Sequence, residues 1–277
     1  MLVKMISSKE QYMSYCSYHM HTTFCDGANT PEEMVLASIE AGCPEIGFSG
    51  HSFLIFDDEW TMVPAKAAEY RETVHRLAEK YADKISIRLG IEQDYCSPTD
   101  ELGLYDYVIG GVHCLFPNGP DGPYVSVDLA VEELQRAIDE VYGGDPYAFA
   151  ENYYETVADL YNRTHCNIIA HFDLCTKFIE RGIDIDINSP RYIAAADKAL
   201  DELLKTPAVF EINKGAVARG YRNDPYPDDR ILKRLGESGH PVIISSDSHS
   251  CDSIIFGFEE AEKRAAKYHL NLLHRLP

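Results

Sequence analysis

The fold is indicated first by residues 16–34, which read CSYHMHTTFCDGANTPEEM. The opening CSYHMHT is typical of a buried strand. Side chains two positions apart on a strand point the same way, so His19 and His21 share a face. The following TPEE is a capping box with proline at the first helical position, which predicts the start of a helix. The stretch therefore predicts a β-strand and then an α-helix, with two imidazoles at the end of the strand and Asp26 just beyond it.

The same alternation continues to the end of the chain. Further strands are expected at residues 45–52, 85–95, 105–113, 167–173, 208–213 and 241–249. Further helices are expected at residues 64–83, 128–140, 146–162, 190–204, 229–237 and 259–268. Apolar strands alternating with helices imply a parallel sheet covered by helices, either as a closed barrel or as an open doubly wound sheet.

Side chains suited to metal binding choose between these two architectures, because they end six of the seven predicted strands. The nine candidates are His19, His21, Asp26, His51, Glu92, His113, His171, Asp247 and His249. Only a closed barrel brings six strand ends around one mouth. An open sheet would spread them along a line, at about 4.8 Å per strand. We therefore predict a barrel with a metal site at the C-terminal face of its strands.

Imidazole and carboxylate together suit Zn, Mn or Fe. A single histidine at a strand end is more often a hydrogen-bonded core residue, so the prediction depends on the whole set. Glu92 would be costly to bury without a counter-charge, which two bridged metal ions would supply. The five other histidines lack this context and are expected to be structural or exposed: His75, His165, His240, His269 and His274.

Bulk properties restrict the class of partner. A chain of 277 residues fits one α/β barrel domain over residues 1–277. The net charge of -20 disfavours nucleic-acid and membrane partners, which would need clustered basic residues. The eight cysteines contain no C-x-x-C pair, and the first residues, MLVKMISSKEQ, carry no apolar signal segment. We expect a cytoplasmic protein; its oligomeric state is not predicted.

The ordered set HMHTTFCDGANTPEEM, GFSGHS, GIEQDY, YVIGGVH, IIAHFDL, FEIN and SSDSH resembles the polymerase and histidinol phosphatase (PHP) family, in particular its stand-alone histidinol-phosphate phosphatase branch. The resemblance covers nearly the whole chain. It implies an α/β fold, a distorted (β/α)7 TIM-like barrel. It also implies three divalent metal ions and hydrolysis of L-histidinol phosphate to L-histidinol and phosphate in histidine biosynthesis.

The resemblance also implies how the nine ligands are shared among the ions. The first ion would take His19, His21, Glu92 and Asp247, the second Glu92, His113 and His171, and the third Asp26, His51 and His249. A hydroxide bridging two ions would attack phosphorus, so no protein nucleophile is needed and Cys25 and Cys114 are expected to be packing residues.

Residues outside the ligand set are expected to handle the substrate. In this family, basic residues in the loops that hold Lys177 and Arg219 are expected to bind phosphate, and arginine would do so through two hydrogen bonds. Asp94 shares a strand face with Glu92 and is expected to orient the substrate's ammonium or protonate its leaving group. Lys214 stands where the family pattern has threonine; it would add a phosphate contact only if it faced the mouth.

Tyr153 and Tyr154 are candidates for the wall of the substrate pocket, although aromatic residues at helical spacing are more often core. Three other functions remain open. These are a phosphatase for other small phosphate esters, a nuclease or phosphodiesterase, and a metal-binding module without activity. The acidic composition weighs against the second, and the complete ligand set weighs against the third.

Overall fold

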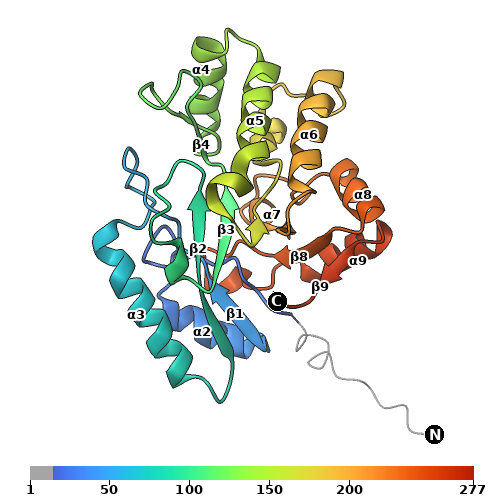
Figure 1. Cartoon of the computed structure of the whole chain (residues 1–277). Helices are drawn as coiled ribbons and strands as arrows, with labels where there is room; N and C mark the ends of the chain where they lie inside the picture. The colour runs from blue at the N-terminus through green and yellow to red at the C-terminus, as the bar shows by residue number, and fades with distance from the viewer. Residues whose placement is uncertain (1–14) are drawn as a thin grey trace, which may run out of the picture.

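The computed structural model describes residues 15–277, and its main sheet is parallel throughout. Seven strands in the order β1-β2-β3-β6-β7-β8-β9 curl into a half-barrel with helices around the outside (Figure 1). The strands are β1 (Glu45–Phe48), β2 (Ser86–Asp94), β3 (Tyr107–Gly111), β6 (Ile168–Ile169), β7 (Val209–Asn213), β8 (Pro241–Ser245) and β9 (Asn271–Leu273). A separate antiparallel pair, β4 (Cys114–Leu115) and β5 (Val125–Ser126), lies beyond β3. The predicted barrel architecture is confirmed.

Helices connect the strands and cover the sheet. They are α2 (Pro31–Glu40), α3 (Pro64–Lys80), α4 (Val131–Val141), α5 (Pro146–Thr164), α6 (Pro190–Leu203), the short α7 (Gly215–Ala218), α8 (Asp229–Ser238) and α9 (Phe258–Lys267). The capping box predicted before α2 is present: the Glu33 backbone N–H donates to the Thr30 hydroxyl, and the Glu33 carboxylate accepts from the Thr30 backbone N–H at 2.8 Å. Asp145 and Asp228 cap α5 and α8 through side-chain oxygens that accept from backbone N–H groups of the first turn.

The prediction of a regular strand at the start of the chain was wrong. Residues 16–21 form only isolated bridges, Ser17 with Ile46 of β1 and Met20 with Ser248 beyond β8. The segment lies between these two neighbours and forms two backbone hydrogen bonds with each, with Gly47 and Ser49 on one side and with Ser248 on the other, so neither side builds a continuous ladder. It nevertheless connects β1 to the chain that follows β8, which is the connection a barrel requires.

The seventh strand of the sheet is β9, which the sequence did not predict. It is three residues long and pairs with the first half of β8. Beyond it, Arg275 forms an ion pair with Glu45, which also accepts hydrogen bonds from Tyr18 at 2.5 Å and Ser86 at 2.9 Å. One buried carboxylate thus connects four separate segments at the N-terminal end of the barrel.

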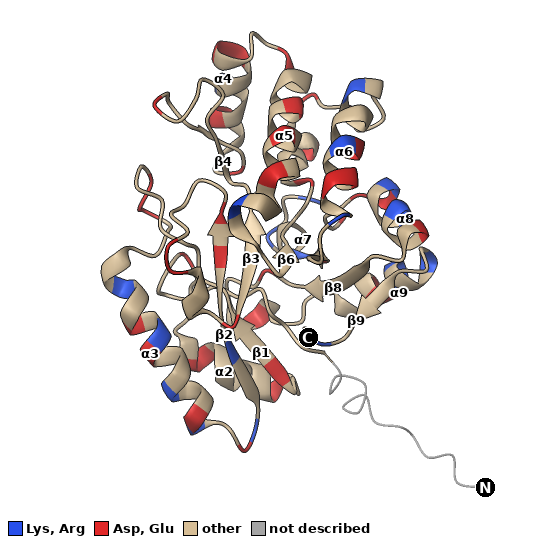
Figure 2. Cartoon of the chain, in the orientation of Figure 1, with Lys and Arg blue, Asp and Glu red and all other residues tan. Residues whose placement is uncertain are grey.

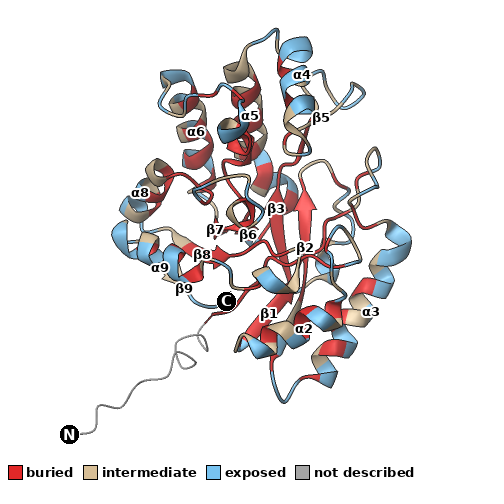
Figure 3. Ribbon diagram, turned by 180° about the vertical axis from the view of Figure 1, so that it is seen from behind, coloured by how far each residue is buried: buried red, intermediate tan, exposed pale blue. Residues whose placement is uncertain are grey.

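The alternation of side chains along the strands produces two cores. One fills the barrel and is made of Cys16, Tyr18, Tyr107, Ile109, Ile168, Ala170, Val209, Ile243 and Leu276. A Cβ on Gly90 would lie 2.2 Å from the Tyr107 ring, so glycine at this position leaves room for that ring. The second and larger core lies between the sheet and the helices. Figure 3 shows the buried residues concentrated in the strands and on one side of each helix.

No helix within residues 15–277 has both the length and the apolar character needed to cross a membrane. The prediction about a signal segment concerns residues outside this range.

Candidate metal centre

The nine predicted ligands lie together at the C-terminal ends of the strands. His19, His21 and Asp26 come from the N-terminal segment and the turn after it, His51 follows β1, Glu92 lies in β2, His113 follows β3, His171 follows β6, and Asp247 and His249 follow β8. Seven of the nine are buried, and Asp26 and His249 are the more exposed members. Segments far apart in the sequence therefore place their polar side chains close together at one end of the barrel.

The first group has the spacing of a four-ligand metal site. The His19 Nε2 atom lies 3.2 Å from Glu92 Oε2 and 3.6 Å from Asp247 Oδ1. The His21 Nε2 atom lies 3.4 Å and 3.3 Å from the same two oxygens. Four atoms at about 2.0–2.1 Å from a tetrahedral ion would be roughly 3.3 Å apart. The four side chains are arranged as they would be around a cation.

Unsatisfied polar atoms give a second test of that fit. Three buried atoms in this group have no hydrogen-bond partner: His19 Nε2, His21 Nε2 and Glu92 Oε2. Buried polar atoms are nearly always paired, and leaving one unpaired costs about 1–3 kcal/mol. A cation at this position would satisfy all three at once, so the residues fit a metal ion.

The second group surrounds the other oxygen of Glu92. Its Oε1 atom lies 3.0 Å from His171 Nε2 and 3.4 Å from His113 Nε2. A Cβ on Gly111 would approach the His113 ring to 2.9 Å and the same Glu92 oxygen to 3.2 Å. Glycine at this strand end therefore leaves room for both side chains, and Glu92 offers one oxygen to each group.

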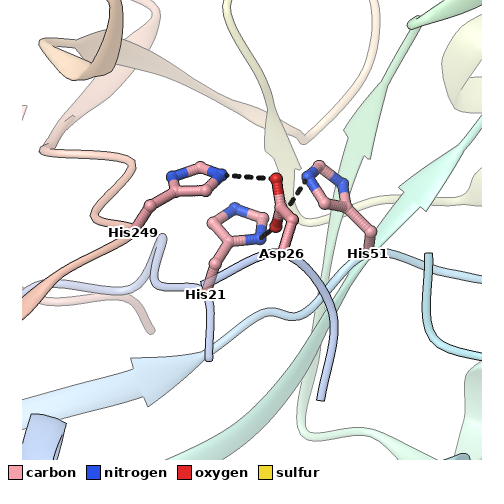
Figure 4. A group of neighbouring side chains, drawn as sticks. All are labelled: His21, Asp26, His51 and His249. Atoms are coloured by element: carbon pink, nitrogen blue, oxygen red, sulfur yellow. Dashed lines mark hydrogen bonds and ion pairs between the residues drawn. The ribbon is translucent and has the colours of Figure 1, made fainter. Parts of the chain in front are cut away.

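The third group is drawn in Figure 4, where His249, His21 and His51 converge on Asp26. The Asp26 carboxylate lies 3.1 Å from His249 Nε2, 3.5 Å from His21 Nδ1 and 3.7 Å from His51 Nε2. His51 also places its Nδ1 atom 2.9 Å from Glu92 Oε2, so its ring lies between two of the groups. The arrangement is compatible with a cation near Asp26.

Electrostatics favour the cation-binding forms of three ligands, His21, Glu92 and Asp247. Burial, followed by two neighbouring imidazoles, lowers the pKa of His21 to about 3, which leaves its ring neutral. Burial alone would raise the pKa of Glu92, but the surrounding histidines outweigh it and hold that pKa well below its usual range. The same balance, with Arg219 as the largest opposing charge, keeps Asp247 ionised.

Two buried carboxylates contact the Nδ1 atoms of His19 and His113 and so orient these rings. Glu211 in β7 was not singled out from the sequence, yet its Oε2 atom lies 3.0 Å from His19 Nδ1. Its other oxygen accepts from the His171 backbone N–H at 2.7 Å. Asp94 accepts from the His113 backbone N–H at 2.8 Å and lies 3.2 Å from that ring's Nδ1 atom. Such contacts fix which ring nitrogen carries the proton and leave the other free for a metal.

Asp94 lies beside His113 rather than at the cavity wall. Its carboxylate is buried, also accepts the Cys96 backbone N–H at 2.7 Å, and is not among the residues that line the pocket. Its observed contacts are with His113 and Cys96, so in this structure it holds the His113 ring and backbone in place.

A cavity of about 220 Å³ opens onto the ligand cluster. Beside seven of the ligands it is lined by Trp60, Ser126, Asp128, Leu129, Leu174, Lys177, Arg219 and Tyr221. Both predicted phosphate-binding residues thus lie at the cavity. Arg219 donates to the Asp247 backbone carbonyl at 3.1 Å and to its carboxylate at 3.2 Å. The Lys177 ammonium donates to Asp128.

Three other sequence-based candidates lie away from the cavity. Lys214 is buried and its ammonium pairs with Glu260 of α9 at 3.0 Å, so it neither faces the mouth nor lies in solvent. Tyr153 and Tyr154 are buried core residues, in contact with Phe172 and Tyr192 respectively through their hydroxyls. The apolar and aromatic residues that line the cavity are instead Trp60, Leu129, Leu174 and Tyr221.

Comparison with known proteins places this geometry in a family. A family model of the PHP domain matches residues 17–215, which is more than half of the chain. The chain belongs to the PHP domain family. The matched range holds seven of the nine ligands; Asp247 and His249 lie beyond it.

Curated relatives of similar length support this membership. A probable histidinol-phosphatase of Deinococcus radiodurans is 28% identical over 261 residues, covering 90% of this chain and 91% of the relative. The histidinol-phosphatase of Bacillus subtilis is 23% identical and covers 87% and 96% respectively.

Two solved structures share the fold. A protein from Listeria monocytogenes matches with a TM-score of 0.78 at 23% identity, over 88% of this chain and 99% of the other. The histidinol phosphate phosphatase of Lactococcus lactis, solved with zinc, L-histidinol and phosphate, matches with a TM-score of 0.70 at 19% identity, over 94% and 95%.

Proposed function

We propose that this chain is a metal-dependent phosphomonoesterase that hydrolyses L-histidinol phosphate to L-histidinol and phosphate, a step of histidine biosynthesis. The observation that carries the proposal is the convergence of three buried, unpartnered atoms, His19 Nε2, His21 Nε2 and Glu92 Oε2, beside a small cavity. The identity of the proposed substrate comes from the relatives named histidinol-phosphatase, which align over most of their length.

We further propose three divalent ions, of Zn, Mn or Fe, on the ligand sets given above. The group around Glu92 Oε2, the group around Glu92 Oε1 and the group around Asp26 would hold one each. Divalent ions held there would supply Lewis acidity, by lowering the pKa of the attacking water and neutralising charge on the phosphate. Glu92 connects the first two groups and Asp247 completes the first.

Arg219 and Lys177 are proposed to bind the remaining phosphate oxygens. Arg219 lies between Asp247 and His249, with one guanidinium nitrogen 2.6 Å from His249 Nδ1. When that Nδ1 instead donates its proton to the Asp247 carbonyl, 3.0 Å away, the His249 Nε2 atom is free for a metal. The guanidinium then loses an acceptor, and a phosphate oxygen can take its place.

The size and charge of the molecule favour a small substrate. A cavity of about 220 Å³ is below the roughly 300–1,000 Å³ of many ligand pockets. Figure 2 shows Lys and Arg intermixed with Asp and Glu on helices such as α3 and α8, and the net charge of -20 disfavours binding to a nucleic-acid backbone. A nuclease is therefore the weaker alternative, and a phosphatase for other small esters is the stronger one. We also propose one domain over the whole chain and a cytoplasmic location.

Phosphate release from a panel of esters tests the proposal. The panel contains L-histidinol phosphate, other small phosphate monoesters and single-stranded DNA, each with and without a chelator. We expect the highest kcat/KM for L-histidinol phosphate, loss of activity with chelator and recovery when Zn or Mn is added back. A higher kcat/KM for another ester would reassign the substrate, and activity that survives complete metal removal would refute the metal-dependent mechanism.

A further inference from the structure

Asp128 is a cavity residue that the proposed reaction leaves without a role. It lies in the loop between β5 and α4, and the cavity is lined by four acidic residues, Asp26, Glu92, Asp128 and Asp247. The other three belong to the ligand groups. Asp128 alone is a carboxylate that the metal-binding arrangement does not require.

Its contacts leave one oxygen available. The Lys177 ammonium donates to the Asp128 backbone carbonyl at 2.7 Å and to its Oδ2 atom at 3.0 Å. No described side chain or backbone group within residues 15–277 donates to Oδ1. Lys177 is itself held in place over the Tyr221 ring, with its nitrogen 4.7 Å from the ring centroid. The ion pair is thus fixed at the cavity wall, and the Asp128 Oδ1 atom is left available to accept a hydrogen bond.

Asp128 is ionised at neutral pH. Burial disfavours the charge, but Lys177 and then His113 outweigh it and lower the pKa of Asp128 to about 2. A fixed negative charge beside a phosphate-binding cavity repels an anionic phosphate ester. Such a charge is useful when the substrate also carries a cation close to its phosphate. The carboxylate then attracts the cation, which offsets its repulsion of the phosphate and favours this substrate over esters without a cation.

L-histidinol phosphate has that arrangement. Its ammonium group is on the second carbon from the ester oxygen, so it must lie close to the phosphate and to the groups that bind it. We propose that Asp128 is a specificity-determining residue, whose carboxylate receives the ammonium of an amino-alcohol phosphate and disfavours esters that lack it. This inference rests on the proposed phosphatase function and narrows its substrate class.

The test compares esters that differ only in the cation. 2-Aminoethyl phosphate and propyl phosphate have nearly the same shape, and only the first carries an ammonium at the relevant carbon. We expect the parent enzyme to prefer the amino ester. Asp128→Asn should reduce kcat/KM for 2-aminoethyl phosphate and L-histidinol phosphate about 10- to 100-fold, while propyl phosphate is unchanged or improved.

Two further variants separate recognition from structure. Asp121→Asn removes an exposed carboxylate from the loop that precedes β5 and should leave the preference unchanged. Asp128→Glu keeps the charge and should retain part of the preference. Equal losses on both small esters in Asp128→Asn, or an Asp128→Glu variant without preference, would overturn the inference. A parent that hydrolyses the amino ester but not L-histidinol phosphate would refute only the substrate proposed above.

Discussion

Glu211 and His19 form a buried pair in which the Glu211 Oε2 atom lies 3.0 Å from the ring Nδ1 atom. The same carboxylate accepts from the His171 backbone N–H at 2.7 Å, from the Asn213 amide at 2.6 Å and from the Ser245 hydroxyl at 2.5 Å. One side chain in β7 therefore fixes parts of two ligand groups. It holds the proton of His19 on Nδ1 and turns Nε2 toward Glu92 and Asp247.

Glu211→Gln should weaken metal binding more than it weakens folding. The amide keeps the size of the side chain but loses the charge that orients His19, and loss of such a partner typically costs 10- to 100-fold in metal affinity. Metal titration in chelator-buffered solution measures this change directly. Glu79→Gln, on the exposed side of α3, is the control and should bind metal like the parent. Parental affinity in Glu211→Gln would remove the positioning role.

Loss of a ligand should abolish turnover. His171→Ala and Asp247→Ala each remove a donor from a buried group, so we expect less bound metal and no measurable phosphate release. Metal content by elemental analysis and activity are measured on the same preparations. His75→Ala, at an exposed position of α3, is the matched control. Full activity with full metal content in either ligand variant would contradict the assignment.

Arg219→Ala should affect substrate binding more than metal content. A hydrogen bond to a charged group contributes about 1.5–3 kcal/mol, so we expect KM to rise about tenfold or more. Steady-state kinetics, together with metal analysis, separate the two effects. Kinetics like those of the parent would exclude Arg219 from the site. Loss of metal without a change in KM would instead show that its contact with Asp247 serves the ligands.

The Glu45 cluster at the opposite end of the barrel should make stability depend on pH. Burial disfavours its charge, but the ion pair with Arg275 and the other hydrogen bonds outweigh burial and lower the pKa of Glu45. Its stabilisation is therefore present above the unfolded-state pKa, near 4.3, and is lost as pH falls below that value. Glu45→Gln should lose about 1–3 kcal/mol at pH 7, and its difference from the parent should shrink below about pH 4.

Denaturant unfolding at several pH values measures that difference. Glu40→Gln removes an exposed carboxylate at the end of α2 and should match the parent throughout. A difference between Glu45→Gln and the parent that stays constant down to pH 3 would show that the charge of Glu45 does not stabilise this end of the barrel.

The sequence predicted the strands of the barrel well where several apolar residues mark them, as in β2 and β8. It failed where pairing is set by neighbours rather than by local pattern. Residues 16–21 have the composition of a strand, but they divide their hydrogen bonds between two neighbours. β9 has three residues, too few for any periodicity to be detected.

The candidate ligands could be predicted because each interrupts or follows an apolar run with a polar residue. Glu211 has a similar signal, a carboxylate in the run AVFEIN, but it lies inside the run rather than at its end and was not predicted. Asp128 and Trp60 lie in irregular loops whose approach to the cavity depends on tertiary packing. For the same reason, the burial of Lys214 against α9 could not be deduced from its neighbours in the chain.

We propose that nine side chains from separate segments hold a cluster of divalent ions. Anomalous diffraction from crystals of an active preparation, recorded near the absorption edge of the bound metal, locates those ions. We expect anomalous peaks between His19, His21, Glu92 and Asp247, between Glu92, His113 and His171, and beside Asp26. An active preparation without metal peaks among these residues, or with its metal bound elsewhere, would contradict it.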